Sequence, residues 1–353
     1  MLNSQITDQY EWRNPNSPKR LEFLNLYANQ RKLFPNILDV DEFYTKFNLH
    51  RKRSINEVNN FRALINQNKI KIEGLENIDL KNPSFFYAFR YGSMMLIPFL
   101  LKYFGVELDF IAGNSSMKKK ERFLNASKNA DLGFGAEDIV IGDSLVGSYK
   151  IFKDKKLGKS FFCSADVGVG MSKNEKNKFV QVEINNNKIN SRFGPAFLAH
   201  RMKIPFIGVW SVRKGDVIHI YFDRLKYVED PIQSTKEIWE KKFNTIVNKD
   251  PSQWESLHYV HKHFVSVEDA VNETNLNLKE FYMFNFLRFH FIIREQEYFL
   301  FDTANWKTIK VKSHLFELLD SLNEEKGNLS YSDCVSLFSS ELFLQLRNLK
   351  ILI

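Results

Sequence analysis

The fold is decided by one stretch of sequence, which reads Phe85-Phe86-Tyr87-Ala88-Phe89-Arg90-Tyr91-Gly92-Ser93-Met94-Met95-Leu96-Ile97-Pro98. It begins with an uninterrupted apolar run, which is typical of a strand buried on both faces. A turn with Gly and Ser follows, and residues 93–103 have the pattern of a buried helix. A strand that leads directly into a helix is the repeating unit of α/β proteins.

Downstream of this stretch, short apolar runs and helical patterns alternate to about residue 265. The sequence predicts strands at 85–89, 108–111, 139–141, 160–164, 206–212 and 217–222, and a hairpin formed by 179–184 and 188–190. It predicts helices at 93–103, 118–127, 195–201, 234–248 and 252–265. We therefore expect one α/β domain over residues 81–265.

Two further segments flank this domain. Residues 1–80 have helical periodicity and no motif that indicates chemistry. After residue 268, a hairpin is expected at 286–294 and 297–301, followed by three helices at 313–325, 331–339 and 340–348. A β-ribbon with three short helices is similar in shape to a winged helix, so we expect a small winged-helix-like C-terminal domain at 268–353 that recruits a partner.

The composition is that of a folded, globular chain. Its 353 residues are 44% hydrophobic and 26% charged, which excludes a disordered or collagen-like protein. The two cysteines, Cys163 and Cys334, are too few for a disulfide framework and indicate a reducing compartment, so we expect a cytoplasmic protein. The most apolar stretch, 94–101, is far shorter than the ~20 residues of a spanning helix. Peripheral contact with the inner membrane remains compatible with this pattern.

The net charge is +8, from 50 basic and 42 acidic residues. A basic chain favours anionic partners, such as phospholipid headgroups or an acidic carrier protein. The chain is also rich in Lys, Asn, Ile and Phe together, a composition that an AT-biased genome produces without selection for charge. The charge therefore permits these partners without identifying one, and no motif indicates nucleic acid or a phosphate-binding glycine loop.

One short motif indicates an esterase. Asp138-Ile139-Val140-Ile141-Gly142-Asp143-Ser144-Leu145 resembles the nucleophile block of the GDSL esterases, which would make Ser144 the nucleophile. Asp216 and His219 have the spacing of the partner Asp-x-x-His pair. They lie in a run that alternates like a strand, however, so their side chains should face opposite sides. About 140 residues precede this motif, which opens the domain in that family, so we treat the esterase as a third alternative.

A dispersed set of motifs is collinear over about 180 residues. It begins with the block around Arg90 and continues with Ser164-Ala165-Asp166-Val167-Gly168. Next come Arg192-Phe193-Gly194-Pro195-Ala196-Phe197-Leu198-Ala199 and Gln253-Trp254-Glu255-Ser256-Leu257-His258. In this order the blocks are similar to those of the late lipid A acyltransferases, within the lysophospholipid acyltransferase-like superfamily. The resemblance implies an acyltransferase-like core, a pocket for an acyl chain and an acyl thioester as donor.

The chain departs from that family at the two positions that do its chemistry. The family uses a His-x4-Asp/Glu pair, in which the histidine removes a proton from the acceptor. Arg90 and Met95 occupy these positions here. An arginine offers hydrogen-bond donors and no acceptor, so it cannot act as a general base. Arg90 can still hold a carboxylate, a phosphate or a thioester oxyanion, and its other interpretation is a structural salt bridge.

The resemblance, read with these departures, implies a set of site residues. Arg90 and Asp166 are the expected catalytic pair, although a helix cap is a common alternative role for such an aspartate. The expected substrate-binding residues are Tyr91, Gly92, Ser93, Met95, Arg192 and Gly194. Lys118, Lys119 and Lys120 could dock an acidic acyl carrier, or form a solvated charged face. We expect no cofactor apart from the carrier or coenzyme A thioester, and no metal, because His258, His261 and His263 lack a companion acid or cysteine at ligand spacing.

Two functions from different classes follow. The first is a divergent acyltransferase-like enzyme that transfers an acyl or related group from a carrier thioester to an amine or hydroxyl without the usual histidine base. In this hypothesis Arg90 and nearby backbone N–H groups hold the oxyanion, and an amine acceptor needs no strong base. The alternative is a catalytically inactive protein of the same fold that binds a lipid or peptide as a scaffold.

Overall fold

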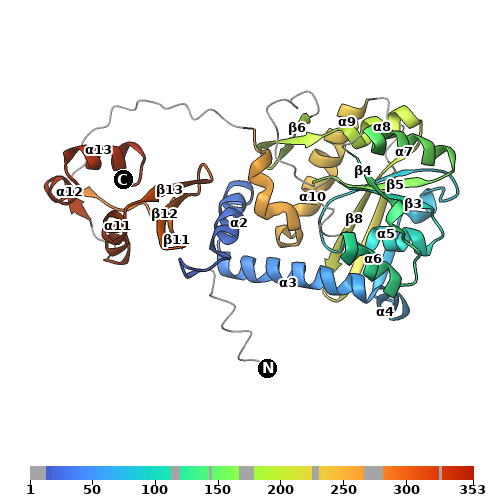
Figure 1. Cartoon of the computed structure of the whole chain (residues 1–353), viewed down its shortest axis with the longest axis horizontal. Helices are drawn as coiled ribbons and strands as arrows, with labels where there is room; N and C mark the ends of the chain where they lie inside the picture. The colour runs from blue at the N-terminus through green and yellow to red at the C-terminus, as the bar shows by residue number, and fades with distance from the viewer. Residues whose placement is uncertain are drawn as a thin grey trace. The chain divides into compact units, whose positions relative to one another are not determined.

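The computed structural model describes residues 13–112, 120–142, 145–166, 179–224, 230–265, 281–325 and 328–353 (Figure 1). The chain forms two compact units. One comprises Lys32–Val265, and the other comprises Met1–Arg31 together with Ser266–Ile353. Each unit has its own hydrophobic core.

The larger unit is an α/β structure built on a mostly parallel, mixed sheet of seven strands in the order β1-β9-β8-β2-β5-β3-β4. Five of these strands, from β8 to β4, run parallel, whereas β9 is antiparallel to β8 and β1 is parallel to β9. The bounds are β1 (Ile70–Glu73), β2 (Phe85–Ala88), β3 (Leu108–Ala112), β4 (Ile139–Ile141), β5 (Ser160–Ser164), β8 (Phe206–Lys214) and β9 (Val217–Arg224). All six strands expected in this sheet are present, and β1 adds a strand inside the segment expected to be helical.

The helices of this unit cover both faces of the sheet. In the described residues they are α3 (Val40–Asn59), α4 (Phe61–Asn66), α5 (Leu96–Tyr103), α6 (Lys120–Asn129), α7 (Leu145–Lys156), α8 (Gly194–Met202), α9 (Pro231–Lys236), the π-helix η6 (Glu237–Phe243), α10 (Asn244–Val247) and the 3₁₀ helices η2 (Leu75–Asn77), η4 (Ala136–Asp138), η7 (Pro251–Gln253) and η8 (Glu255–His263). A separate hairpin is formed by β6 (Phe179–Ile184) and β7 (Asn187–Arg192). Helix α7 was not expected, and the expected helix at 252–265 is a pair of 3₁₀ helices.

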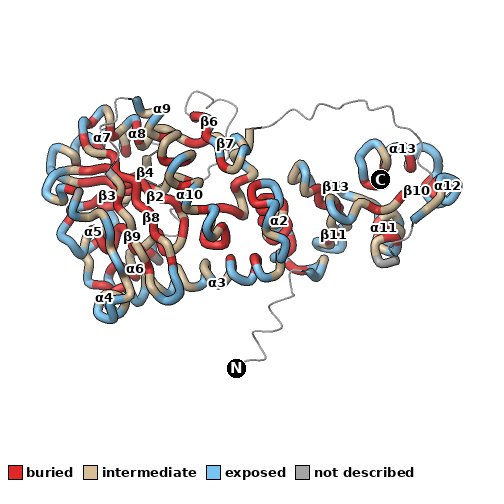
Figure 2. Tube along the Cα trace, turned by 180° about the vertical axis from the view of Figure 1, so that it is seen from behind, coloured by how far each residue is buried: buried red, intermediate tan, exposed pale blue. Residues whose placement is uncertain are grey.

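Strand β2 is buried on both faces, as its apolar run requires. Phe86 and Ala88 pack into the core on the α5 side. Phe85 and Tyr87 point to the opposite face, where both rings contact Phe206. Figure 2 shows the central strands buried along their length.

The order in which the chain adds strands to the sheet reverses between the parallel neighbours β2 and β5. From β2 the chain passes through α5 to β3 and β4 on one side, and from β5 it passes through α8 to β8 on the other. The two strands are direct neighbours, with Ala88 opposite Ser164. In open α/β sheets, ligands bind outside the carboxyl ends of the strands at such a switch point. The topology therefore predicts a ligand site at the residues that follow β2 and β5.

The smaller unit combines an antiparallel meander with three helices. Its elements are β11 (Phe289–Arg294), β12 (Glu297–Asp302), β13 (Lys307–Val311), α11 (Ser313–Glu325), α12 (Tyr331–Phe338), α13 (Ser340–Asn348) and the short pair β10 (Phe281–Tyr282) with β14 (Leu329–Ser330). Strand β13 extends the expected hairpin. At the start of α2 (Arg20–Leu33), Arg20 donates a hydrogen bond from Nε to the Phe291 carbonyl at 3.3 Å. No helix in the described part of the chain is long and apolar enough to cross a membrane.

Candidate functional site

Asp166 joins three separate segments at the switch point. Its Oδ1 accepts hydrogen bonds from the Arg90 backbone N–H at 2.9 Å and from Ser164 Oγ at 3.1 Å. Its Oδ2 accepts from Trp254 Nε1 at 2.7 Å. The carboxylate therefore links the ends of β2 and β5 to the residue between η7 and η8.

The segment after β2 is also held by backbone pairing. Tyr91 and Trp254 form an antiparallel bridge. The Gly92 N–H donates to the Gln253 carbonyl at 3.0 Å, and the Glu255 N–H donates to the Arg90 carbonyl at 2.8 Å. Buried backbone groups beyond the end of a strand need partners, and residues 253–255 supply them. Two sequence blocks more than 160 residues apart are thus fixed side by side.

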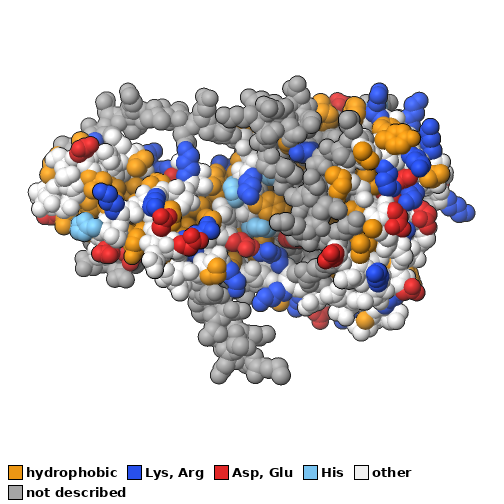
Figure 3. Space-filling view, in the orientation of Figure 1, with side chains coloured by type: hydrophobic (Ala, Val, Ile, Leu, Met, Phe, Trp, Pro, Cys, Tyr) orange, Lys and Arg blue, Asp and Glu red, His pale blue; other side chains and the backbone are white. Residues whose placement is uncertain are grey.

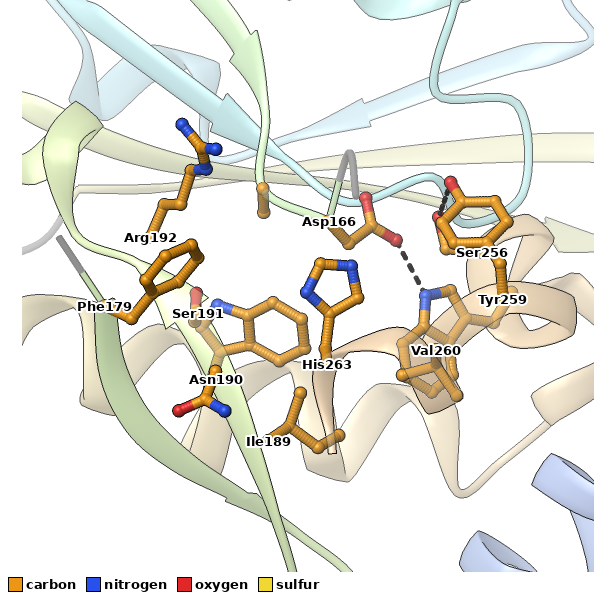
Figure 4. Close-up of a pocket in the computed structure, with 13 residues that line it drawn as sticks. Asp166, Phe179, Ile189, Asn190, Ser191, Arg192, Ser256, Tyr259, Val260 and His263 are labelled. Carbon is orange, nitrogen blue, oxygen red and sulfur yellow. Dashed lines mark hydrogen bonds between the residues drawn. The ribbon is translucent and has the colours of Figure 1, made fainter. Parts of the chain in front are cut away.

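A small hollow opens beside Asp166, with an interior volume of about 20 Å³ (Figure 4). We call it the Asp166 hollow. It is lined by Ala165, Asp166, Phe179, Ile189, Asn190, Ser191, Arg192, Trp239, Trp254, Ser256, Tyr259, Val260 and His263. These residues come from the end of β5, the β6–β7 hairpin, η6 and η8, so the hollow lies at the carboxyl edge that the topology indicates.

His263 is the titratable base of the hollow. Figure 4 shows its imidazole between Asp166 and the β7 residues Asn190 and Ser191. Burial lowers the pKa of His263, although the Asp166 carboxylate and a hydrogen bond with the Asn190 backbone oppose this shift. Its Nε2 is buried and has no hydrogen-bond partner among the described residues. A neutral imidazole with an unpartnered nitrogen can accept a proton from a bound molecule.

The Arg90 guanidinium is not among the groups that line the hollow, but it contacts Tyr259, which does line it. Its Nη1 is 3.5 Å from Tyr259 Oη and 3.8 Å from Glu255 Oε1, and its Nε is buried without a hydrogen-bond partner in the described structure. Burial lowers the pKa of Arg90, yet the pKa is raised overall because Tyr259, Glu255 and Asp166 lie nearby. The cation is thus buried and only loosely paired, unlike the arginine of a tight structural salt bridge.

Two hydroxyl groups belong to residues that line the hollow. Ser256 Oγ and Tyr259 Oη are 2.7 Å apart, and either oxygen can be the donor. Because Arg90 donates to Tyr259, the pair uses one of its two hydroxyl hydrogens internally and keeps the other. The spare hydrogen can be donated to an oxygen atom bound in the hollow. Neither residue was expected to contribute to a site.

Arg192 and Gly194 lie on the opposite wall and at its edge. Arg192 ends β7, lines the hollow, and stacks its guanidinium 5.3 Å from the Phe179 ring centre. Gly194 begins α8, and a side chain added there would meet nothing within 4 Å. Of the expected site residues, the structure therefore brings Asp166 and Arg192 into the hollow itself and places Arg90 in contact with Tyr259.

The other four expected substrate-binding residues lie in the interior. Tyr91 is buried, and its hydroxyl donates to the Asp250 carbonyl at 2.9 Å. Gly92 has φ +59°, and an added Cβ would lie 2.2 Å from the Ser211 carbonyl oxygen. Ser93 is 1% exposed, and Met95 packs against the core. None of the four is among the residues that line the Asp166 hollow, and Gly92 and Met95 are half-buried.

Ser93 belongs to a second polar cluster, which we call the Arg213 network. It comprises His50, Glu57, Ser93, Arg213, Asp250 and Gln253. Arg213 donates to both Glu57 carboxylate oxygens, at 3.0 and 2.6 Å, and to Ser93 Oγ at 2.7 Å. The Ser93 hydroxyl donates to Glu57 in turn. Nη1 faces His50 Nδ1 at 2.7 Å, so all three nitrogens of the guanidinium have a partner within the network.

The backbone N–H groups of the turn are likewise occupied. Those of Arg90, Tyr91 and Gly92 donate to Asp166, Phe89 and Gln253, respectively. The expectation that neighbouring backbone N–H groups stabilise an oxyanion is therefore wrong for these three, because folding already uses each donor. Ser256 and Tyr259, which both line the hollow, carry hydroxyl groups that can donate instead.

The remaining sequence hypotheses fall at other places. Lys118 and Lys119, and the esterase candidate Ser144, lie outside the described residues, and Lys120 begins α6 with no description of its side chain. Asp216 is exposed in the turn before β9, while His219 Nδ1 is 3.4 Å from Glu73 Oε1. Cys163 is fully enclosed in β5, and burial raises the pKa of its thiol beyond the usual range. Within the described ranges, no group of three His, Cys, Asp or Glu side chains is arranged to hold a metal ion.

The sequence blocks thus meet at Asp166 through hydrogen bonds within this chain. Comparison with models of known protein families and with curated proteins finds no match.

Proposed function

We propose that this chain is a divergent acyltransferase-like enzyme that transfers an acyl or related group from a carrier thioester to an amine or hydroxyl at the Asp166 hollow. One observation carries the proposal. The four collinear blocks that resemble the late lipid A acyltransferases meet at this place through Arg90, Asp166, Arg192 and Trp254. Blocks this far apart in sequence need not converge unless they serve one site.

The hollow offers the groups that acyl transfer needs. The acceptor nitrogen or oxygen attacks the thioester carbonyl, the C–S bond breaks, and the thiolate leaves. His263 Nε2 takes the acceptor's proton and can pass it to the leaving sulfur. The spare hydroxyl hydrogen of Ser256 or Tyr259, supported by the Arg90 cation, stabilises the oxyanion.

In this mechanism Asp166 is a positioning residue. Its three accepted hydrogen bonds leave it anchored beside the imidazole, where its negative charge favours the protonated form of His263. Arg90 is a cation without an acceptor, so it supplies charge and not proton transfer. His263, at the end of η8, thus acts as the general base in place of the histidine that the resembled family has at the position of Arg90.

The test uses purified protein, acyl carrier and coenzyme A thioesters, and a panel of amines and alcohols. Free thiol release and the mass of the acylated acceptor are measured together. His263→Gln should lower kcat/KM by about 100-fold or more, whereas His314→Gln, an exposed histidine of the other unit, should leave it unchanged. Transfer that is absent in the native protein, or equal in His263→Gln, contradicts the proposal.

The alternative, a binding protein without catalysis, predicts a different pattern. Ligand would bind the native protein and weaken in Arg192→Gln, with no thiol released from any thioester. Native mass spectrometry of the same samples separates the two outcomes. The proposed reducing, cytoplasmic location is supported by Cys163 and Cys334, which are both buried and unpaired.

For residues 268–353 we propose a winged-helix-like domain that recruits a partner protein. The antiparallel strands β11 and β12 and the three short helices α11, α12 and α13 support this fold. The third strand β13 is compatible with it, since it continues the same meander.

A further inference from the structure

Helix α7 carries large apolar side chains on the face turned away from the sheet. Val146 is 79% exposed, Tyr149 74% and Phe152 42%, and Leu157, directly after the helix, is 68% exposed. At 100° per residue these four positions fall within about 140° of the helix circumference. The opposite side, with the fully buried Ile151, faces the core. Exposure of several large apolar side chains on one stripe marks an interaction surface.

Basic side chains share this stripe. Lys153 and Lys156 are exposed between the apolar positions. The acid of this helix, Asp154, points inward and pairs with Lys150, so it does not offset their charge. On neighbouring α8, Phe197 is exposed and Arg201 lies 5.8 Å from its ring centre. Figure 3 shows apolar side chains among basic ones over this part of the molecule.

We infer that this surface, formed by Val146, Tyr149, Phe152, Lys153, Lys156 and Leu157 of the α7 region with Phe197 and Arg201 of α8, binds the surface of an anionic phospholipid bilayer. Apolar and aromatic side chains enter the boundary between headgroups and acyl chains, while lysines beside them contact lipid phosphates. A surface of mixed apolar and exposed basic side chains complements an anionic bilayer in both respects. This inference does not depend on the proposed enzymatic activity.

The experiment measures co-sedimentation of the full chain with vesicles of phosphatidylcholine alone and with one quarter phosphatidylglycerol. Binding should be about tenfold or more tighter with the anionic lipid and weaken as salt rises. Lys153→Gln/Lys156→Gln should remove most of that difference, and Val146→Ser/Tyr149→Ser should weaken binding to both vesicles. The matched control, Leu38→Ser/Lys249→Gln, replaces an exposed leucine and lysine elsewhere and should change neither.

A second measurement reports insertion directly. Because both native cysteines are buried, Val146→Cys can be labelled selectively with a polarity-sensitive fluorophore. Its emission should shift to the blue on anionic vesicles, whereas label at Leu38→Cys should not. Equal sedimentation of all variants, no preference for anionic lipid, or an unshifted label overturns the inference. So does binding of an acidic carrier protein, or dimer formation, that is lost in the same variants while vesicles are ignored.

Discussion

Two clusters of polar side chains lie on either side of the turn after β2, and each contains a buried arginine. In the Arg213 network the guanidinium is 2% exposed, and its nitrogens contact Glu57, Ser93 and His50 at 3.0 Å or less. At the Asp166 hollow the Arg90 side chain is 17% exposed, its contacts are 3.5 and 3.8 Å long, and Nε is unpartnered. In the first cluster every guanidinium nitrogen has a close partner. The second retains unused hydrogen-bonding capacity, as a site for a ligand does.

Replacement of Arg213 should cause the largest loss in the free energy of unfolding. Arg213→Met leaves Glu57 and Ser93 without their donor in a buried place. We expect the free energy of unfolding to fall by about 3–5 kcal/mol, measured by urea denaturation. Lys214→Met, at the exposed neighbouring position, should change it by less than about 0.5 kcal/mol. A loss below about 1 kcal/mol for Arg213→Met would contradict the assignment of a structural role.

A second test replaces Gly92 in the turn after β2. Gly92→Ala places a Cβ at φ +59° and 2.2 Å from the Ser211 carbonyl oxygen. We expect a loss of about 2–3 kcal/mol from the left-handed conformation and the displaced strand. Gly194→Ala has open space and serves as the control in the same thermal or urea unfolding experiment. Equal stability of the two variants would show that the turn is more adaptable than its contacts indicate.

The third prediction concerns pH and His50. Burial, followed by the neighbouring Arg213, lowers the pKa of His50 to about 4. Between the unfolded value near 6.5 and pH 4 the unfolded chain binds the additional proton, so stability falls as pH falls through this window. His50 should account for about 2 kcal/mol of this loss.

The measurement compares urea unfolding of the native chain and His50→Gln at pH 7 and pH 4.5. His50→Gln should show the shallower pH dependence, and a residual slope should remain because the pKa values of His261 and His290 are also lowered to about 4. Parallel curves for the two proteins would remove His50 as a source of acid sensitivity.

The smallest change in the free energy of unfolding is expected for replacement of Arg90. Arg90→Met makes the same replacement as Arg213→Met, at the loosely paired arginine. We expect the free energy of unfolding to change by less than about 1 kcal/mol, because a buried cation with poor partners contributes little net stability. Urea denaturation of the two methionine variants side by side tests this. A loss as large as that of Arg213→Met would make Arg90 structural and weaken its place in the proposed site.

The sequence predicts the sheet well and the sites poorly, for physical reasons. Strand β5 begins and ends at the expected residues because burial on both faces imposes a continuous apolar run. The edge strand β4 also has the expected bounds, although its two isoleucines are only half-buried. Helix α7 was not expected, since its exposed Tyr149 and Phe152 hide the helical period of its polar face. The short strand β1 was not expected either, because four residues at a sheet edge carry little pattern.

The site residues differ in how well the local sequence predicts their position in the fold. Asp166 was expected because an acid directly after a buried strand lies at the carboxyl edge of the sheet. Ser93 was expected in the site and lies elsewhere, since nothing in the local sequence shows on which side of a turn a side chain points. Ser256 belongs to the motif block at 253–258, whereas Tyr259 and His263 lie beyond it. All three line the hollow, and η8 pairs with the turn after β2 through a long-range contact that the local sequence does not show.

The pairing of β1 with β9 has a consequence for synthesis of the chain. Ile70 is opposite Ile218, so the edge strand meets its neighbour only after most of the larger unit has left the ribosome. Closing so long a loop carries an entropic cost that local contacts do not repay in advance. Residues 70–73, in which Ile alternates with Lys and Glu, therefore lack their sheet partner for much of translation, and we expect them to join the sheet late in folding.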